Sequence, residues 1–451
     1  MSEPSEDVYS KYEKFFKEYD ETIYRAWYTS DESGQNDLLG YKLEKFHAKG
    51  AFGKVYKAHD DKGTLIAIKI LLEEERKKPD FLQSFRRGVR SMKLLSDRKV
   101  DGIVEYKTAF EIPAFVVMNW VDGPNLDLAI RTKLIQGWQP ILKIGKDLAK
   151  IIENAHRIPE RVLHRDLRPP NIMLEGLYLD KSKWKVVVLD FDLSWHLGAS
   201  EKSIVGSGST TGYLAPEQIQ QSPDVSTRHA AVDSYGIGMT LFFMIAGRDP
   251  FPTENLHKDW QKNIYDSAVN IKEDSWKSLP NRFSRLIMNA TKLKQSERWD
   301  ISQIKYELER LYEALKKTDS VESVELIAEE IFCRTKYSTE YKWDSDKLSA
   351  SINSSSGVQI CLIGHESKKQ LVLKIDWNDQ SGSGAKKISK WLGKSEPKIL
   401  AKLTSSNWKI ETHTKSGRAM HVTATLDISI AKEHLNDIAK CLDKVTDELI
   451  F

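Results

Sequence analysis

Four short segments between residues 41 and 118 have the composition of strands. Apolar and polar residues alternate along 41–46 and 53–58, whereas 65–70 and 114–118 are mostly apolar, as expected of buried strands. Residues 60–63 separate the second from the third and have the composition of a hairpin turn. Apolar residues from Phe81 to Met92 recur at helical spacing instead, with Asp80 as a candidate N-cap. The pattern predicts a small sheet with one helix.

From Gly123 to Leu315 the apolar spacing is mostly helical, which predicts a larger helical lobe after the sheet. The longest apolar run in this part is 235–247. It is shorter than the roughly 20 residues that a helix needs to cross a bilayer. We therefore expect a buried helix there, and no membrane segment.

After residue 318 the alternating pattern returns, and it predicts a separate α+β domain over 319–451. Its expected strands are 358–363, 371–377, 408–413 and 420–426, and a final helix is expected over 431–449. A group of lysines in this domain is consistent with a basic patch, but a solvated helix face is the favoured interpretation: Lys386, Lys387, Lys390 and Lys394. At the other end of the chain, aromatic residues at helical spacing predict a helical extension over 1–40.

Composition narrows the class of protein. A chain of 451 residues exceeds the size at which a single core keeps growing, so we expect more than one domain. The 68 basic and 65 acidic residues leave a net charge of only +3, which gives no global electrostatic case for nucleic-acid or membrane binding. Three widely spaced cysteines suit a reducing compartment, and the acidic N-terminus lacks a signal peptide. These features favour a soluble, cytoplasmic protein.

Two stretches in the large lobe carry candidate chemistry: 164–171, with the sequence HRDLRPPN, and 189–192, with the sequence LDFD. They supply carboxylates and an amide where phosphoryl transfer needs a base and metal ligands. These stretches closely resemble the catalytic and metal-binding loops of the protein kinase family, and further landmarks extend the resemblance over about 41–315. The resemblance implies a bilobal α+β kinase fold, with a small lobe at 41–122 and a large lobe at 123–318, and use of ATP and Mg²⁺.

The resemblance also implies roles for individual residues. Asp166 takes the position of the catalytic base, and Arg168 stands where the family usually has lysine. Asn171 and Asp190 are the expected Mg²⁺ ligands. Lys69 is similar to the strand lysine that pairs with the ATP phosphates.

Further positions resemble the family's nucleotide pocket and activation segment. Those expected at the nucleotide are Ala48, Gly50, Gly53, Val55, Met118, Asn119 and Val121. The activation loop, about 193–214, offers as candidate phosphosites Ser203, Ser207, Ser209, Thr210 and Thr211. Thr210 falls where serine/threonine kinases contact the base. Glu217 and Arg298 are expected to form a buried ion pair, and Asp233 is expected to cap the catalytic loop.

Two positions depart from the family pattern. Active kinases carry on the small-lobe helix a glutamate that pairs with the strand lysine, and here that position is Gly88. Asp192 stands where the family normally has glycine. One hypothesis links the changes, with Asp192 supplying the charge that Gly88 lacks, or helping to bind a metal ion. The alternative is that Asp192 points away from Lys69. A further hypothesis is that Arg86, Arg87 or Arg90 binds activation-loop phosphate.

Three functions are consistent with these residues. The favoured one is a serine/threonine protein kinase that acts on protein substrates and on its own activation loop. A pseudokinase that binds ATP and signals through residues 319–451 is the second. A small-molecule phosphotransferase ranks last, because such relatives usually lack the Ala-Pro-Glu segment at 215–217. A homodimer through the C-terminal domain is a further expectation.

Overall fold

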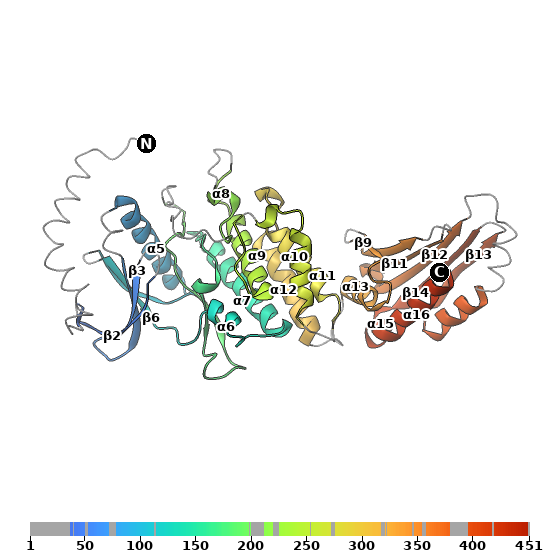
Figure 1. The fold of residues 1–451 in the computed structure, drawn as a ribbon, viewed down its shortest axis with the longest axis horizontal. Helices are drawn as coiled ribbons and strands as arrows, with labels where there is room; N and C mark the ends of the chain where they lie inside the picture. Colours follow the sequence, from blue (N-terminus) through green and yellow to red (C-terminus); the bar gives the residue numbers. More distant parts are fainter. Residues whose placement is uncertain are drawn as a thin grey trace. The chain divides into compact units, whose positions relative to one another are not determined.

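The computed structural model describes residues 37–449 except 39, 50–52, 72–77, 112–113, 198, 200–211, 220–224, 253, 272–275, 317–320, 322, 345–346, 354–357, 379–395 and 417–418. Contacts divide the chain into two compact units (Figure 1). The first comprises Met1–Ile271 with Phe283–Glu309, and the second comprises Lys272–Arg282 with Arg310–Phe451. In the described part of the chain, no helix has both the length and the apolarity to cross a membrane.

The first unit begins with a six-stranded antiparallel sheet of order β1-β2-β3-β4-β6-β5. Its strands are β1 (Asp37–Leu38), β2 (Tyr41–Lys49), β3 (Gly53–His59), β4 (Leu65–Leu71), β5 (Tyr106–Glu111) and β6 (Ala114–Asn119). Ile66, Ile68, Phe115 and Val117 form its buried core. The sheet expected from the alternating pattern is confirmed, whereas β5 was not anticipated, because Lys107 and Thr108 interrupt its apolar pattern.

Helix α5 (Pro79–Asp97) lies beside this sheet (Figure 1). The expectation that Asp80 caps the helix is wrong. Lys78 is the N-cap residue and makes no side-chain capping bond, while Asp80 lies in the first turn. Proline lacks a backbone N–H and has a fixed φ, so Pro79 suits the first helical position and the helix starts before Asp80.

The helical lobe follows. Its elements are α6 (Leu126–Arg131), α7 (Trp138–Arg157), α8 (Pro216–Ile219), α9 (Ala231–Ala246), α10 (Trp260–Val269), α11 (Leu279–Ala290) and α12 (Ile301–Lys316). The buried helix expected over 235–247 is confirmed as α9, whose residues are buried from Ala231 to Ile245. A short hairpin, β7 (Ile172–Glu175) with β8 (Lys185–Val188), directly follows the candidate catalytic loop. The α+β bilobal architecture expected from the resemblance is thereby confirmed.

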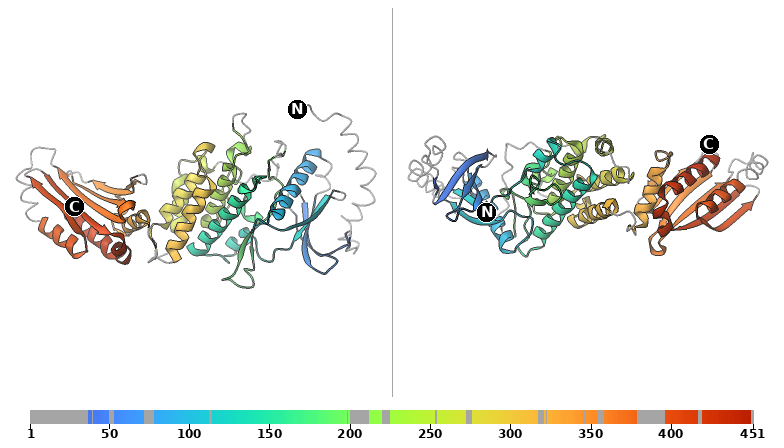
Figure 2. Two further views of the ribbon diagram at one scale, coloured as in Figure 1. Left: turned by 180° about the vertical axis from the view of Figure 1, so that it is seen from behind. Right: turned by 90° about the horizontal axis from the view of Figure 1, so that it is seen from below.

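The second unit contains an antiparallel sheet of order β13-β14-β12-β11-β10-β9. Its strands are β9 (Lys342–Asp344), β10 (Ser349–Asn353), β11 (Val358–His365), β12 (Gln370–Asn378), β13 (Lys409–Ser416) and β14 (Ala419–Asp427). Helices α13 (Val324–Arg334), α15 (Ile428–Glu433) and α16 (Leu435–Leu449) pack with it (Figure 2). The four strands expected here are observed, while β9, β10 and α13 were not anticipated. The single helix expected over 431–449 is two helices, because the backbone leaves helical geometry at His434.

Buried ionic contacts explain why 272–282 belongs to the second unit. Glu330 is fully buried and accepts hydrogen bonds from the backbone N–H groups of Lys277 and Ser278, each at 2.8 Å. Arg282 contacts Glu329 at 2.6 Å and Glu325 at 2.9 Å. A buried carboxylate is stable only when paired in this way, so these contacts fix α13 to residues 277–282. The domain boundary expected at residue 319 stays a prediction. The lysines at 386–394 and most of the 1–40 extension lie outside the described residues.

Candidate active site

A cavity of about 290 Å³ lies in the first unit. It is bordered by the sheet, the segment after β6 and the loops that flank β7 and β8. Its lining includes every predicted nucleotide, base and metal residue that the structure describes: Ala48, Gly53, Val55, Lys69, Met118, Asn119, Val121, Asp166, Arg168, Asn171 and Asp190. Gly50 lies outside the described residues. Residues that are far apart in sequence therefore meet at one concave site.

Asp166 is held in place within the loop that precedes β7. The Asn171 side-chain nitrogen donates to its carboxylate at 3.1 Å and to its backbone carbonyl at 2.9 Å. Arg168 Nε lies 3.3 Å from the same carboxylate. Burial raises the pKa of Asp166, although the Arg168 charge opposes that shift. The result is an oriented carboxylate that faces the cavity and whose proton affinity is higher than usual.

The backbone around this carboxylate adopts a costly conformation. Arg165 and Asp190 have φ angles of 68° and 61°, in the left-handed region that residues with a Cβ rarely occupy. Asp233, on α9, accepts hydrogen bonds from the backbone N–H groups of His164 at 2.9 Å and Arg165 at 2.7 Å. Gln218 donates to the Arg165 carbonyl at 2.9 Å. These buried contacts hold the backbone at Arg165 in its strained conformation, and strain of this kind clusters at functional sites.

Lys69 makes two short ion pairs at the back of the cavity. Its Nζ lies 2.8 Å from Asp190 Oδ1 and 2.6 Å from Asp192 Oδ2. Burial alone would lower the pKa of Lys69, but the two carboxylates raise it. Burial and the neighbouring Asp190 charge raise the pKa of Asp192 to about 6, whereas the Lys69 charge keeps the pKa of Asp190 low against its burial. Of the two arrangements considered for Asp192, the structure has the one in which it faces Lys69.

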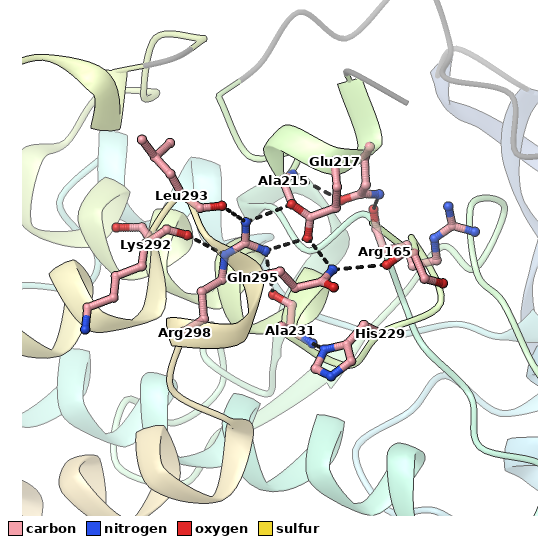
Figure 3. Close-up of polar contacts among 12 residues, drawn as sticks. Arg165, Ala215, Glu217, His229, Ala231, Lys292, Leu293, Gln295 and Arg298 are labelled. Carbon is pink, nitrogen blue, oxygen red and sulfur yellow. Dashed lines mark hydrogen bonds and ion pairs between the residues drawn. The ribbon is translucent and has the colours of Figure 1, made fainter. Parts of the chain in front are cut away.

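Glu217, in the short helix α8, and Arg298 lie in direct bidentate contact (Figure 3). Arg298 Nη1 and Nη2 lie 2.5 Å and 2.7 Å from the two carboxylate oxygens of Glu217. Arg298 also donates to the carbonyls of Lys292 and Leu293. Both side chains are almost fully buried. The pair therefore anchors α8 to the helical lobe.

Comparison with known proteins assigns the first unit to a family. The family model described as protein kinase domain matches residues 41–307, more than half of the chain. The chain belongs to the protein kinase family. No family model matches the C-terminal part.

Curated relatives agree with this assignment. The chain is 28% identical over 263 residues to a probable serine/threonine-protein kinase of Clostridium perfringens, a match that covers 56% of this chain and 36% of that protein. It is 27% identical over 258 residues to serine/threonine-protein kinase PrkC of Bacillus subtilis, a match that covers 56% of this chain and 37% of that protein. A probable myosin light chain kinase of Dictyostelium discoideum is 26% identical over 270 residues, 58% of this chain and 66% of that protein. The match thus spans between about a third and two thirds of these relatives' lengths.

Some residues of the kinase site were not predicted from the sequence. Gln218 bridges Ala215 and Arg165, and His156 Nε2 contacts Asp233 at 2.8 Å. Neither residue lies in a motif with a chemical reason for that position, and only the folded packing brings them to the catalytic loop. The predicted phosphosites at 203–211 lie outside the described residues.

Asp233 gives the kinase domain a specific pH dependence. Burial by itself would raise the pKa of Asp233, but its hydrogen bond with His156 and its backbone donors hold it below the ordinary value of 3.8. A carboxylate with a lower pKa in the folded state contributes its full stability above the unfolded pKa, and loses it as the pH falls through the folded value. We expect Asp233→Asn to lower the unfolding free energy near pH 7 by about 2 kcal/mol. Thermal unfolding from about pH 7 to about pH 3 should show the two proteins converge below about pH 4; a difference independent of pH would contradict this.

Proposed function

We propose that the protein is an ATP- and Mg²⁺-dependent serine/threonine protein kinase that transfers the γ-phosphate of ATP to protein hydroxyls. The observation that carries this proposal is the meeting of Lys69, Asp166, Asn171 and Asp190 at one cavity. These are the side chains that phosphoryl transfer requires for phosphate contact, proton acceptance and metal binding. The names of the relatives support serine/threonine acceptors.

The donor set at the cavity fits a hard divalent cation. Asp190 offers a carboxylate, and Asn171 offers an amide oxygen because its nitrogen already donates to Asp166. Oxygen ligands of this kind are those that Mg²⁺ prefers, together with substrate phosphates. When bound, Mg²⁺ neutralises charge on the transferring phosphate. Asn171 and Asp190 are the residues that would hold it.

The other side chains of the cavity bind the nucleotide or take part in proton transfer. Asp166 accepts or orients the proton of the attacking hydroxyl, and its raised pKa strengthens it as a base. Arg168 keeps a positive charge beside that carboxylate. Lys69 presents its ammonium group to the phosphates. Backbone groups at Asn119 and Val121 bind the adenine, with further contacts from Ala48, Gly50, Gly53, Val55 and Met118.

Phosphopeptide mapping tests this function on the purified protein. Incubation with ATP and Mg²⁺ should produce phosphoserine and phosphothreonine, including sites among Ser203, Ser207, Ser209, Thr210 and Thr211. Omission of Mg²⁺ should prevent their formation. Nucleotide binding without any phosphorylation, on the protein itself or on added protein substrates, would contradict the proposal and favour an ATP-binding pseudokinase.

We further propose that Arg87 and Arg165 bind the phosphorylated activation loop. Both are nearly fully buried, and burial together with the charges of Arg87 and Arg228 lowers the pKa of Arg165 to about 10. Buried arginines that repel one another are well placed to bind a phosphate group. Among the three arginines considered on α5, Arg87 is the buried one, while Arg86 and Arg90 are exposed.

Substitution of Arg87 tests whether this arginine, rather than its exposed neighbours on α5, binds the activation-loop phosphate. We expect Arg87→Ala to lower the activity of the loop-phosphorylated protein about tenfold, since a charge-assisted hydrogen bond contributes about 1.5–3 kcal/mol. Arg86→Ala is the matched control and should retain full activity. Steady-state rates of the phosphorylated and phosphatase-treated forms provide the measurement. Equal losses in both forms would show that Arg87 acts independently of phosphate.

Three expectations about the location and the partners of the protein belong to the same proposal. We infer a cytoplasmic location and no role for nucleic acid, from the balanced charge and the sparse cysteines. A homodimer through 319–451 stays a prediction, which light scattering of the full chain tests.

A further inference from the structure

We propose that Asp192 replaces the missing helix glutamate as the residue that positions Lys69, and that Gly88 is required because it leaves room for this arrangement. The inference deepens the proposed function and rests on it. It explains the two departures from the family pattern, Gly88 and Asp192, by a single arrangement. Asp192 is a positioning residue in this scheme, since it acts through Lys69.

The first observation is the contact itself. The Lys69 ammonium lies 2.6 Å from Asp192 Oδ2, closer than its 2.8 Å contact with Asp190. The side chains of Lys69 and Asp192 are only 13% and 11% exposed. Shielding from water strengthens such a pair and makes the loss of either partner costly. Asp192 therefore occupies the electrostatic role that the family assigns to the helix glutamate.

The second observation is steric and concerns α5. A Cβ atom at Gly88 would lie 2.8 Å from the Phe191 carbonyl oxygen and 3.2 Å from the Asp192 Cα. These are backbone atoms, which cannot rotate away as a flexible side chain can. Any residue with a Cβ at position 88, glutamate included, would push the helix away from the segment that carries Asp192. Close packing therefore requires glycine at position 88, in addition to the fact that this position lacks the usual glutamate.

A third contact holds the same surfaces together one turn further along. Ser194 donates a hydrogen bond to the Ser91 hydroxyl at 2.8 Å, and both side chains are fully buried. Residues three apart in a helix share one face, so Gly88 and Ser91 both face the segment 191–194. The helix is packed against the segment that follows the metal ligand Asp190. In this kinase the carboxylate that holds the lysine lies on that segment and not on the helix.

The charge on Asp192 is tested by Asp192→Asn, which keeps the size of the side chain. We expect the dissociation constant for ADP with Mg²⁺, or the KM for ATP, to rise about 10–100-fold, because a buried charged partner is lost. Asp192→Glu, the conservative variant, should recover part of the affinity. The control is Asp97→Asn, since Asp97 forms a 2.8 Å pair with Lys93 that is exposed to solvent. That variant should bind nucleotide like the wild type.

The steric part is tested on α5. Gly88→Ala and Gly88→Glu should both lower kcat and the melting temperature, whereas Lys93→Ala on the exposed face of the same helix should change neither. Gly88→Glu with wild-type or higher activity would overturn the inference, because the helix would then accept the usual carboxylate. Asp192→Asn with wild-type nucleotide affinity would also overturn it. If a higher Mg²⁺ concentration fully restored the nucleotide affinity of Asp192→Asn, that result would also overturn the inference, because it would assign Asp192 to metal binding.

One measurement separates this inference from the proposed function. Melting temperatures of wild type, Lys69→Met, Asp192→Asn and the double variant form a cycle that needs no catalysis. The inference predicts that Asp192→Asn lowers the melting temperature clearly less in the Lys69→Met protein than in the wild type. Additive shifts would overturn it even in an active kinase. A coupled pair in a protein that transfers no phosphate would support the positioning contact while the proposed function failed.

Discussion

Replacing Asp190 by asparagine is expected to reduce phosphoryl transfer by about three orders of magnitude. The Asp190 carboxylate lies 2.8 Å from Lys69 Nζ and takes the position expected of a metal ligand. Loss of metal charge at the transferring phosphate removes several kcal/mol of transition-state stabilisation, and each 1.4 kcal/mol corresponds to about tenfold in rate. The substitution keeps the side-chain size, so the cavity should persist.

The dependence on Mg²⁺ makes the prediction specific to metal binding. Initial rates over a range of Mg²⁺ concentrations should show that the variant needs far more metal than the wild type. Asp147→Asn, at an ion pair of 3.0 Å with Lys143 outside the cavity, is the control and should behave like the wild type. Retention of wild-type rate and Mg²⁺ dependence by Asp190→Asn would show that this carboxylate does not bind the metal.

Breaking the buried Arg298–Glu217 pair is expected to cause the largest loss of stability. Arg298→Met leaves the Glu217 carboxylate buried without its bidentate partner, and removal of one member of such a pair costs about 3–5 kcal/mol. The free energy of unfolding from chemical denaturation measures this loss. The double variant with Glu217→Gln should recover part of it, because no uncompensated buried charge remains.

An exposed pair of similar length provides the control. Lys294 lies 2.8 Å from Glu297, and both side chains are more than half exposed. Water screens such a pair, so Lys294→Ala should leave stability unchanged within error. If Arg298→Met were as stable as Lys294→Ala, the pair would not anchor α8 to the helical lobe.

The fold was predictable where the periodic pattern was strong. The strands predicted at 53–58 and 65–70 and the buried helix predicted from the apolar run 235–247 are observed as β3, β4 and α9. Strand β5 and helix α13 were not predicted, because their charged residues obscure the periodicity. In α13 those charges are buried by partners from distant segments, as Glu330 is by the backbone of Lys277. A single sequence does not reveal such pairing.

The site was predictable to a different extent. Asp166, Asn171 and Asp190 sit in motifs whose residue types have a chemical reason, so their convergence was expected. The sequence also revealed that Gly88 and Asp192 depart from the family pattern, but it left open whether Asp192 faces Lys69. The reason for the glycine is that a Cβ atom at position 88 would lie only 2.8 Å from the Phe191 carbonyl oxygen, and this closeness depends on how the helix packs against the loop. That is a property of tertiary packing.

The most direct test of the kinase function is a time course of phosphate transfer from γ-labelled ATP, with Mg²⁺, for the wild type and Asp166→Asn. We expect label to accumulate on serine and threonine in the wild type, and at least about 10²-fold more slowly in the variant, because a general base contributes about 10²–10⁴ to the rate. Both proteins should bind ATP with similar affinity. Equal rates in the two proteins, or ATP binding by the wild type without transfer, would contradict the assignment of this cavity as a kinase active site.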